Sequence, residues 1–86
     1  MVTRIKEPVS VKLVYSSLKN TVYPERIYWR GRFYPITKIG LHHIFREGRT
    51  LKHIFTVVSG ETAFRLSLDS ETLHWILEEV SYVDAS

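Results

Sequence analysis

The sequence has 86 residues, of which 44% are hydrophobic and 13% are aromatic. That length suits one domain, and each buried aromatic side chain removes about 150–250 Å² from water, so a few of them can build a small core. Charged residues make up 24%, close to the globular average, which excludes the highly charged type of disordered chain. The formal net charge of +3 permits an anionic partner without requiring one.

The chain contains no cysteine. Small secreted domains usually carry disulfides, so their absence favours a reducing compartment, and it also excludes thiol nucleophiles and cysteine-based zinc sites. No segment approaches the about 20 apolar residues of a membrane-spanning helix, and the first residues contain no signal-peptide core. The sequence therefore predicts a cytoplasmic protein that has no membrane partner.

The N-terminal third of the chain predicts a leader and two strands. Residues 1–8 are rich in charge and end in proline, so we expect a flexible leader outside the domain. Over residues 9–15 apolar and polar side chains alternate with one exception, which predicts a strand, and residues 16–21 follow as a loop. Pro24 is expected to begin the next strand, because proline is tolerated at the first position of a strand.

A tight hairpin is the clearest local signal in the sequence. Two β-prone runs flank Arg30 and Gly31, and a two-residue turn needs the positive φ that glycine adopts freely. Pro35 has no N–H, so its strand is expected at a sheet edge or a bulge. The register that follows pairs Trp29 with Arg32, Tyr28 with Phe33, and Ile27 with Tyr34.

Three further strands are predicted in the middle of the chain. Residues 41–46 can form a strand after a bend at Gly40, and residues 47–49 form a turn. Residues 50–59 are rich in β-branched and aromatic side chains, and residues 61–69 show the most regular alternation in the protein.

The turn between the last two of these strands is expected at Ser59 and Gly60. This turn pairs Phe55 with Phe64 and Val57 with Thr62, which gathers the apolar side chains on one face. The predicted core consists of Phe55, Val57, Phe64, Leu66 and Leu68.

The last segment supports two interpretations. Leu73, Ile76, Leu77 and Val80 have the i, i+3, i+4, i+7 spacing of a helical stripe, which predicts a helix over residues 70–81. The same segment is also a plausible strand. Periodicity alone favours the helix, which would make the fold α+β.

Two motifs resemble a small bacterial β-domain family that has no assigned activity. A W-x-G-R-x-Y hairpin motif matches residues 29–34, and a D-x-x-T-x-x-W-x-L-E-x-V motif matches residues 69–80. The sequence departs from the family between Gly40 and Lys52, where relatives carry tryptophans. Members of this family occur alone or beside translesion-type polymerase homologues.

The resemblance implies a turn at residues 69–74 and a final strand at residues 75–83 in place of the helix. The fold class predicted in this way is all-β, a single domain over residues 9–83 followed by a tail at residues 84–86. A small antiparallel meander or half-open barrel of about six strands would limit exposed edges. The alternative is the α+β fold with residues 70–81 helical.

The histidines do not predict a metal site. His42 and His43 are adjacent, so on a strand they point to opposite faces and cannot both bind one ion. Neither His53 nor His74 completes a recognised ligand spacing with them. We therefore expect no metal and no other cofactor.

Catalytic motifs are also missing from the sequence, which has no nucleophile elbow and no glycine-rich phosphate loop. Glu78 and Glu79 form a carboxylate pair in sequence, but on a strand their side chains are expected to diverge. So small a domain would also struggle to enclose a substrate pocket of about 300–1,000 Å³. We expect a protein that is not an enzyme.

Basic residues are interleaved with aromatic ones in the middle of the chain, whereas most acidic residues lie in the C-terminal third. Arginines combined with stackable rings are the means by which many small β modules bind single-stranded nucleic acid. The candidate binding residues are Arg26, Tyr28, Trp29, Arg30, Arg32, Phe33, Tyr34, Arg46, Arg49 and Lys52.

The predicted hairpin register places aromatic rings on both faces, and both cannot be core in a single open sheet. Tyr28 and Phe33 share one face, opposite Trp29 and Tyr34, so one pair is either covered or exposed for binding. The sequence thus predicts a protein-docking or self-associating domain, with a homodimer formed by edge pairing as one possibility. The alternative is a single-stranded nucleic-acid-binding accessory module.

Overall fold

Eight strands and no helix make up residues 2–82, the part of the chain that the computed structural model describes. None of these elements is a helix long and apolar enough to cross a membrane. The strands outnumber those expected from the sequence: β1 (Val2–Pro8), β2 (Ser10–Ser16), β3 (Thr21–Trp29), β4 (Arg32–Pro35), β5 (Lys38–Glu47), β6 (Thr50–Ser59), β7 (Thr62–Asp69) and β8 (Trp75–Tyr82).

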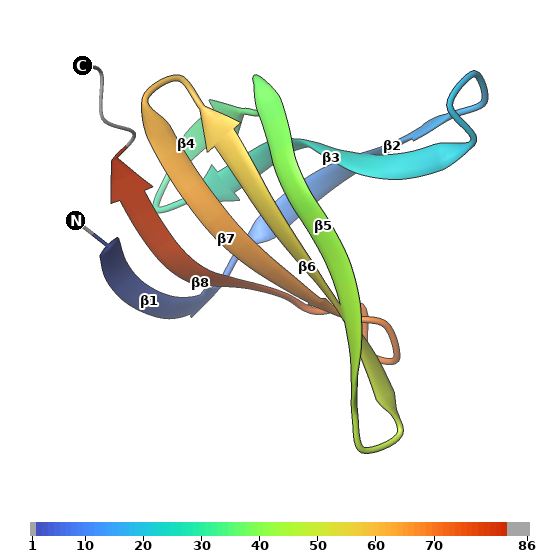
Figure 1. The fold of residues 1–86 in the computed structure, drawn as a ribbon. Helices are drawn as coiled ribbons and strands as arrows, with labels where there is room; N and C mark the ends of the chain where they lie inside the picture. The colour runs from blue at the N-terminus through green and yellow to red at the C-terminus, as the bar shows by residue number, and fades with distance from the viewer. Residues whose placement is uncertain (1, 83–86) are drawn as a thin grey trace.

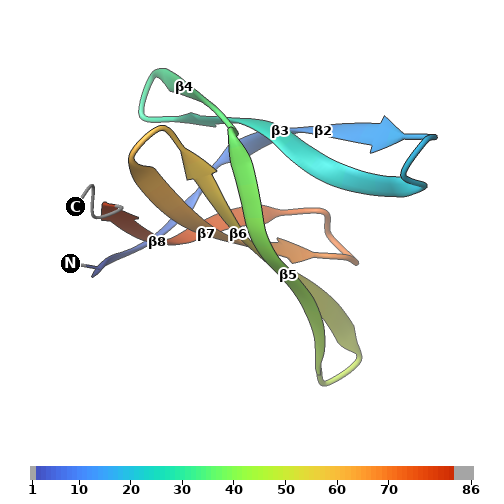
Figure 2. The same cartoon turned by 45° about the horizontal axis from the view of Figure 1, so that its top comes forward.

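The strands form two antiparallel sheets that face each other (Figure 1). The larger sheet has the order β1-β8-β7-β6-β5, and the smaller has the order β2-β3-β4. The predicted all-β class is confirmed, and the α+β alternative is wrong. The two sheets are not closed into a barrel. They lie close together near the β3–β4 hairpin and diverge toward the β2–β3 and β5–β6 loops, as both views show (Figures 1 and 2).

The chain passes between the sheets twice without losing its backbone hydrogen bonds. At the first crossing the Val9 N–H donates to the Trp75 carbonyl at 3.2 Å. At the second, Ile36 donates to the Glu25 carbonyl of the small sheet at 2.8 Å, and Thr37 donates to the Val58 carbonyl of the large sheet at 2.8 Å. The crossings meet the large sheet at opposite ends of its strands, at Trp75 and at Val58, and both meet the small sheet in the part next to the β3–β4 hairpin.

The core lies between the large sheet and the part of the small sheet next to the β3–β4 hairpin. Ile27 from the small sheet is fully buried against Val57, Phe64 and Leu66 of the large sheet. Four of the five predicted core residues are buried, and the fifth, Leu68, is partly buried and packs against them. Apolar burial of about 25 cal/mol per Å² is the main force that holds the sheets face to face.

The β3–β4 hairpin has the predicted turn and register. Trp29 pairs with Arg32, and the two residues before Trp29 pair as expected. Arg30 and Gly31 both have positive φ, 52° and 76°, which a two-residue turn of this hand requires. β4 is an edge strand, so the missing N–H of Pro35 is tolerated there.

The predicted β6–β7 register is wrong by two residues. The turn is at Gly60 and Glu61, so Val57 pairs with Phe64 and Phe55 pairs with Leu66. Glycine at the first turn position supplies the positive φ, 62°, that the turn needs. The predicted core residues still lie on the core face, because side chains alternate with period two and a register shift of two residues keeps each side chain on the same face.

Segment 75–82 is strand β8, so the helix that periodicity favoured is wrong. Leu77 and Val80 share a face because a bulge at β8 inserts one residue between them: Leu66 pairs with Leu77, but Arg65 pairs with Glu79. The predicted turn before this strand is confirmed, and Val83 lies outside the described residues.

Two further expectations need correction. Residues 2–8 are not a leader outside the domain, because they form β1 and pair with β8. Pro24 does not begin a strand but lies inside β3, where it is fully buried. It lies next to a bulge, because Lys12 pairs with Arg26 whereas Leu13 pairs with Pro24, which leaves Glu25 as the extra residue. A bulge of this kind tolerates proline because it interrupts the hydrogen-bond ladder. The predicted tail at residues 84–86 lies outside the described residues.

Candidate functional site

The aromatic hairpin divides its rings between two faces. Trp29 and Tyr34 point into the core, where their ring centres lie 6.3 and 5.1 Å from that of Phe64 in edge-on geometry. Such pairs contribute about 0.5–1.5 kcal/mol beyond the area they bury. These two candidate binding residues therefore hold the sheets together.

Arg30, a third candidate, is occupied by a contact within the domain. Its Nη2 lies 2.7 Å from Glu7 Oε2, and Trp29 Nε1 donates to Glu7 Oε1 at 2.9 Å. The Arg30 hydrogen bond, followed by that of Trp29, lowers the pKa of Glu7, and Glu7 raises the pKa of Arg30. The guanidinium also lies 4.6 Å from the Trp29 ring. This cluster ties β1 to the β3–β4 hairpin.

Tyr28 and Phe33 form the exposed pair, 43% and 61% accessible, with ring centres 4.7 Å apart. Arg26 Cζ lies 5.4 Å from the centre of the Phe33 ring. The structure thus brings together Arg26, Tyr28 and Phe33 on the outer face of the small sheet. Arg32 lies beside them in sequence, at the start of β4, and is exposed.

The remaining basic candidates lie elsewhere. Arg46, Arg49 and Lys52 belong to the β5–β6 hairpin, whose tip points away from the β3–β4 hairpin in both views (Figures 1 and 2). Lys52 Nζ also lies 3.6 Å from Glu47 Oε2. The ten candidate residues therefore do not form one continuous surface.

The most unusual surface is β5, which the sequence did not single out. All ten of its residues are exposed, and it pairs with β6 on one side only. His42 stacks on Phe55, so His42 and Ile44 lie on the inner face, toward the small sheet. Leu41 and Phe45 lie on the outer face. Leu41 is 64% and Ile44 is 53% accessible, so both faces present apolar side chains to water.

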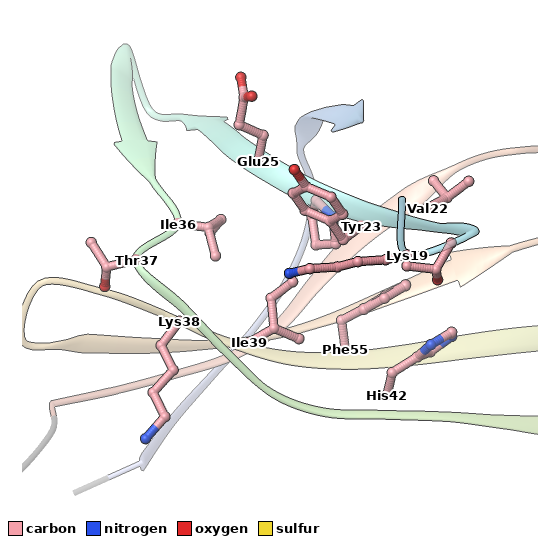
Figure 3. A pocket seen from close by; sticks show the side chains of 12 residues that line it. Lys19, Val22, Tyr23, Glu25, Ile36, Thr37, Lys38, Ile39, His42 and Phe55 are labelled. Carbon is pink, nitrogen blue, oxygen red and sulfur yellow. The ribbon is translucent and has the colours of Figure 1, made fainter. Parts of the chain in front are cut away.

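A groove of about 660 Å³ runs along the inner side of β5 (Figure 3). It lies between β5 and the part of β3 that β4 does not cover. Ile39, His42 and Phe55 form its floor, and Val22 lines the facing side. A second cavity of about 250 Å³ shares Val22, His42 and Phe55 with the groove and continues it toward Trp75.

Two histidines lie in this groove region. His42 Nε2 and His53 Nδ1 are 3.0 Å apart, so one ring donates a hydrogen bond to the other. Burial, followed by the nearby His53 and His43, lowers the pKa of His42, which favours the neutral ring. Within residues 2–82 no group of three histidine or acidic side chains is placed to hold a metal ion.

The outer face of the large sheet carries a polar cavity of about 570 Å³. Glu78 and Glu79 both line it, so the expectation that they diverge is wrong, because Glu78 is the extra residue of the β8 bulge. Ser67 Oγ donates to Glu78 at 2.7 Å, and Arg65 lies 4.0 Å from Glu79. Each carboxylate therefore has its own partner within the sheet.

Comparison with known proteins gave no relative: no family model, no curated protein and no solved structure matches this chain. The resemblance drawn from the two motifs stays a prediction.

The strand at residues 41–46 was predicted, but its position at an exposed edge was not, because an apolar run does not show whether its strand is central or at an edge. The signal was present in residues 41–45, Leu-His-His-Ile-Phe, where apolar side chains occupy both alternating faces. A strand of this kind is either buried on both faces or available to a partner.

Proposed function

We propose that this protein is a docking domain that accepts an additional β-strand along β5. The observation that carries the proposal is the exposed edge of β5, ten residues long, with apolar side chains on both faces. A strand at a sheet edge presents unpaired N–H and C=O groups that a second extended chain can satisfy.

The other long edge of the same sheet supports this choice by contrast. β1 carries Arg4, Lys6 and Glu7, contains a bulge, and ends at Pro8. Charge, bulges and proline are the usual means by which proteins protect an edge from pairing. Within β5 the bulge at Gly40 is close to one end, and residues 41–45 carry no such protection.

The groove supplies a basis for selectivity. A strand added about 4.8 Å from β5 would lie along the mouth of the groove, because Ile39 and His42 of β5 form part of the groove floor. Every second side chain of the added strand would then point toward Ile39, His42 and Phe55. Main-chain hydrogen bonds would provide affinity, and the groove would select apolar side chains of suitable size.

A phage-displayed library of random decapeptides tests the proposal with the intact chain as bait. We expect wild type to enrich peptides with alternating apolar residues. The variant Ile44→Lys, which places a charge on the inner face of β5, should lose at least about tenfold in affinity for them. Val2→Lys, on the edge strand β1, is the matched control and should bind as wild type does. Peptides that bind both variants equally, or no enrichment at all, would refute the proposal.

Single-stranded nucleic acid is the second candidate ligand, supported by the exposed rings of Tyr28 and Phe33 beside Arg26. Rings next to a cation can stack with bases while the cation contacts phosphate. If this candidate is correct, a labelled oligonucleotide binds at low salt, the affinity falls steeply with added salt, and Phe33→Ala weakens it. Absence of binding at low salt would remove it.

A further inference from the structure

We infer that the strand accepted by β5 is β5 of a second copy of this chain, with the two-fold axis at His43. This inference rests on the proposed function and adds the partner and the register. It comes from the arrangement of charged and apolar side chains on the outer face of β5, where Lys38, Leu41, His43, Phe45 and Glu47 lie.

Symmetry limits the possible registers. Two identical edge strands related by a two-fold axis pair antiparallel, and the axis is perpendicular to the sheet, so outer faces continue into outer faces. The axis must therefore pass beside one residue, which then lies opposite its own copy. His43 and His42 are the two residues nearest the middle of β5.

The bulge at Gly40 shifts the start of the strand by one position. Ile39 pairs with Val57, whereas Leu41 pairs with Thr56, so Gly40 is the extra residue. Counted along the ladder from His43, Leu41 is two positions away and Lys38 is four. On the other side Phe45 is two positions away and Glu47 is four.

With the axis at His43, the outer face therefore matches itself. Leu41 lies opposite Phe45 of the second copy, and Lys38 lies opposite Glu47 of the second copy. The two-fold symmetry repeats each of these pairs, so each occurs twice in the dimer. Opposite charges and apolar side chains placed directly across antiparallel strands stabilise the pairing. Lys38 makes no ion pair with residues 2–82, whereas Glu47 makes one exposed pair with Lys52, so both can take part.

The competing register, with the axis at His42, lacks this match. There Lys38 would lie opposite Phe45 of the second copy, and Leu41 would lie opposite His43. Both ends would then place a charge against an aromatic ring, and Glu47 would extend beyond the paired region. The charge pattern thus selects one register.

The outer face decides the register, because on the inner face the axis at His43 places Ile39 opposite Arg46 of the second copy, whereas the axis at His42 would place Ile39 opposite Ile44. Ile44 lies opposite His42 of the second copy, one of the residues on the floor of the groove. Each β5–β6 hairpin would then approach the groove mouth of its partner. In this region the β5–β6 hairpin points away from the small sheet (Figure 2).

Charge reversal tests the inference by sedimentation equilibrium at protein concentrations from about 10 μM to about 1 mM, where small interfaces dissociate. Lys38→Glu and Glu47→Lys each replace two attractive pairs by two repulsive ones, so we expect each to raise the dimer Kd about tenfold. The double variant restores attraction with the signs exchanged and should return the Kd to within about threefold of wild type. Arg49→Glu, in the turn outside the paired residues, is the control.

A second measurement fixes the axis and does not depend on charge. Because the chain has no cysteine, His43→Cys introduces a single thiol, and in the proposed dimer mild oxidation cross-links the two copies through a disulfide, which diagonal positions about 7–8 Å apart cannot form. His42→Cys places its thiol on the other face and away from the axis, so it should cross-link much less.

The outcomes separate this inference from the function on which it rests. A chain that stays monomeric at the highest concentration, or a double charge variant that is no better than the singles, overturns the β5–β5 dimer. If such a chain still selects library peptides that Ile44→Lys rejects, strand addition at β5 stands and only the identity of the partner is wrong. Preferential cross-linking through His42→Cys overturns the proposed register.

Discussion

At the scale of single residues, the loop before β8 is notable because it places a leucine in a conformation that leucine rarely adopts. Leu73 has φ 62°, and its N–H donates to the Asp69 carbonyl at 2.7 Å. The Asp69 carboxylate accepts hydrogen bonds from the N–H groups of Glu71 and Thr72, and the Thr72 bond is the main cause of a lowered pKa at Asp69. The turn is therefore built by Asp69, and Leu73 bears the backbone strain.

We predict that Leu73→Asn stabilises the domain by about 1 kcal/mol, because asparagine tolerates the left-handed region that costs other residues about 1–2 kcal/mol. Leu73 is exposed, so little packing is lost. The measurement is the urea midpoint of unfolding. Leu18→Asn removes another exposed leucine that has no positive φ, and it should leave the midpoint unchanged. Equal shifts in both variants would show that exposure, and not the backbone, is the cause.

At the scale of elements, β1 is held in two ways. It pairs with β8 in the large sheet, and Glu7 at its end binds Trp29 and Arg30 of the β3–β4 hairpin. A segment that the sequence suggested would be a leader is thus a link between the two sheets.

We predict that Glu7→Gln destabilises the domain at neutral pH and has a smaller effect in acid. The pKa of Glu7 is lowered in the folded protein, so its contribution is present above the pKa of the unfolded chain and is lost as pH falls through the folded pKa. Urea unfolding of both proteins between pH 7 and about pH 3 measures the difference, which should shrink toward acid. Glu25→Gln removes an exposed ion pair with Lys12 and should have little effect at any pH. A difference that is constant with pH would contradict the prediction.

At the scale of the whole molecule, the two sheets depend on one core. Phe64 is fully buried, and its ring lies against Trp29 and Tyr34 of the opposite sheet. The small sheet has three strands, and with so little area of its own it relies on this contact for stability.

We predict that Phe64→Ala costs about 3–5 kcal/mol and that both sheets respond together. The chain has two tryptophans, Trp29 in the small sheet and Trp75 in the large one, so Trp75→Phe and Trp29→Phe leave one fluorescent reporter in each sheet. When Phe64→Ala is added to each of these two single-tryptophan proteins, the urea midpoint of unfolding should fall by the same amount in both. Phe33→Ala, at an exposed ring, should cost no more than about 1 kcal/mol. Separate transitions for the two reporters would show that the sheets unfold independently.

The sequence by itself determined the features that depend on neighbouring residues. The β3–β4 hairpin and its register follow from the positive φ that Gly31 supplies, and the strand at residues 50–59 follows from its β-branched and aromatic side chains. The face that holds Phe55 and Phe64 was also predictable, because alternation survives a register slip of two residues.

Only the tertiary structure decided the features that depend on distant residues. The bulge at Glu78 puts Leu77 and Val80 on one face, which in sequence has the spacing of a helix. Which ring pair of the hairpin is buried depended on the sheet packed against it. The edge position of β5, and with it the proposed docking surface, depended on strand order, which local side-chain patterns do not encode.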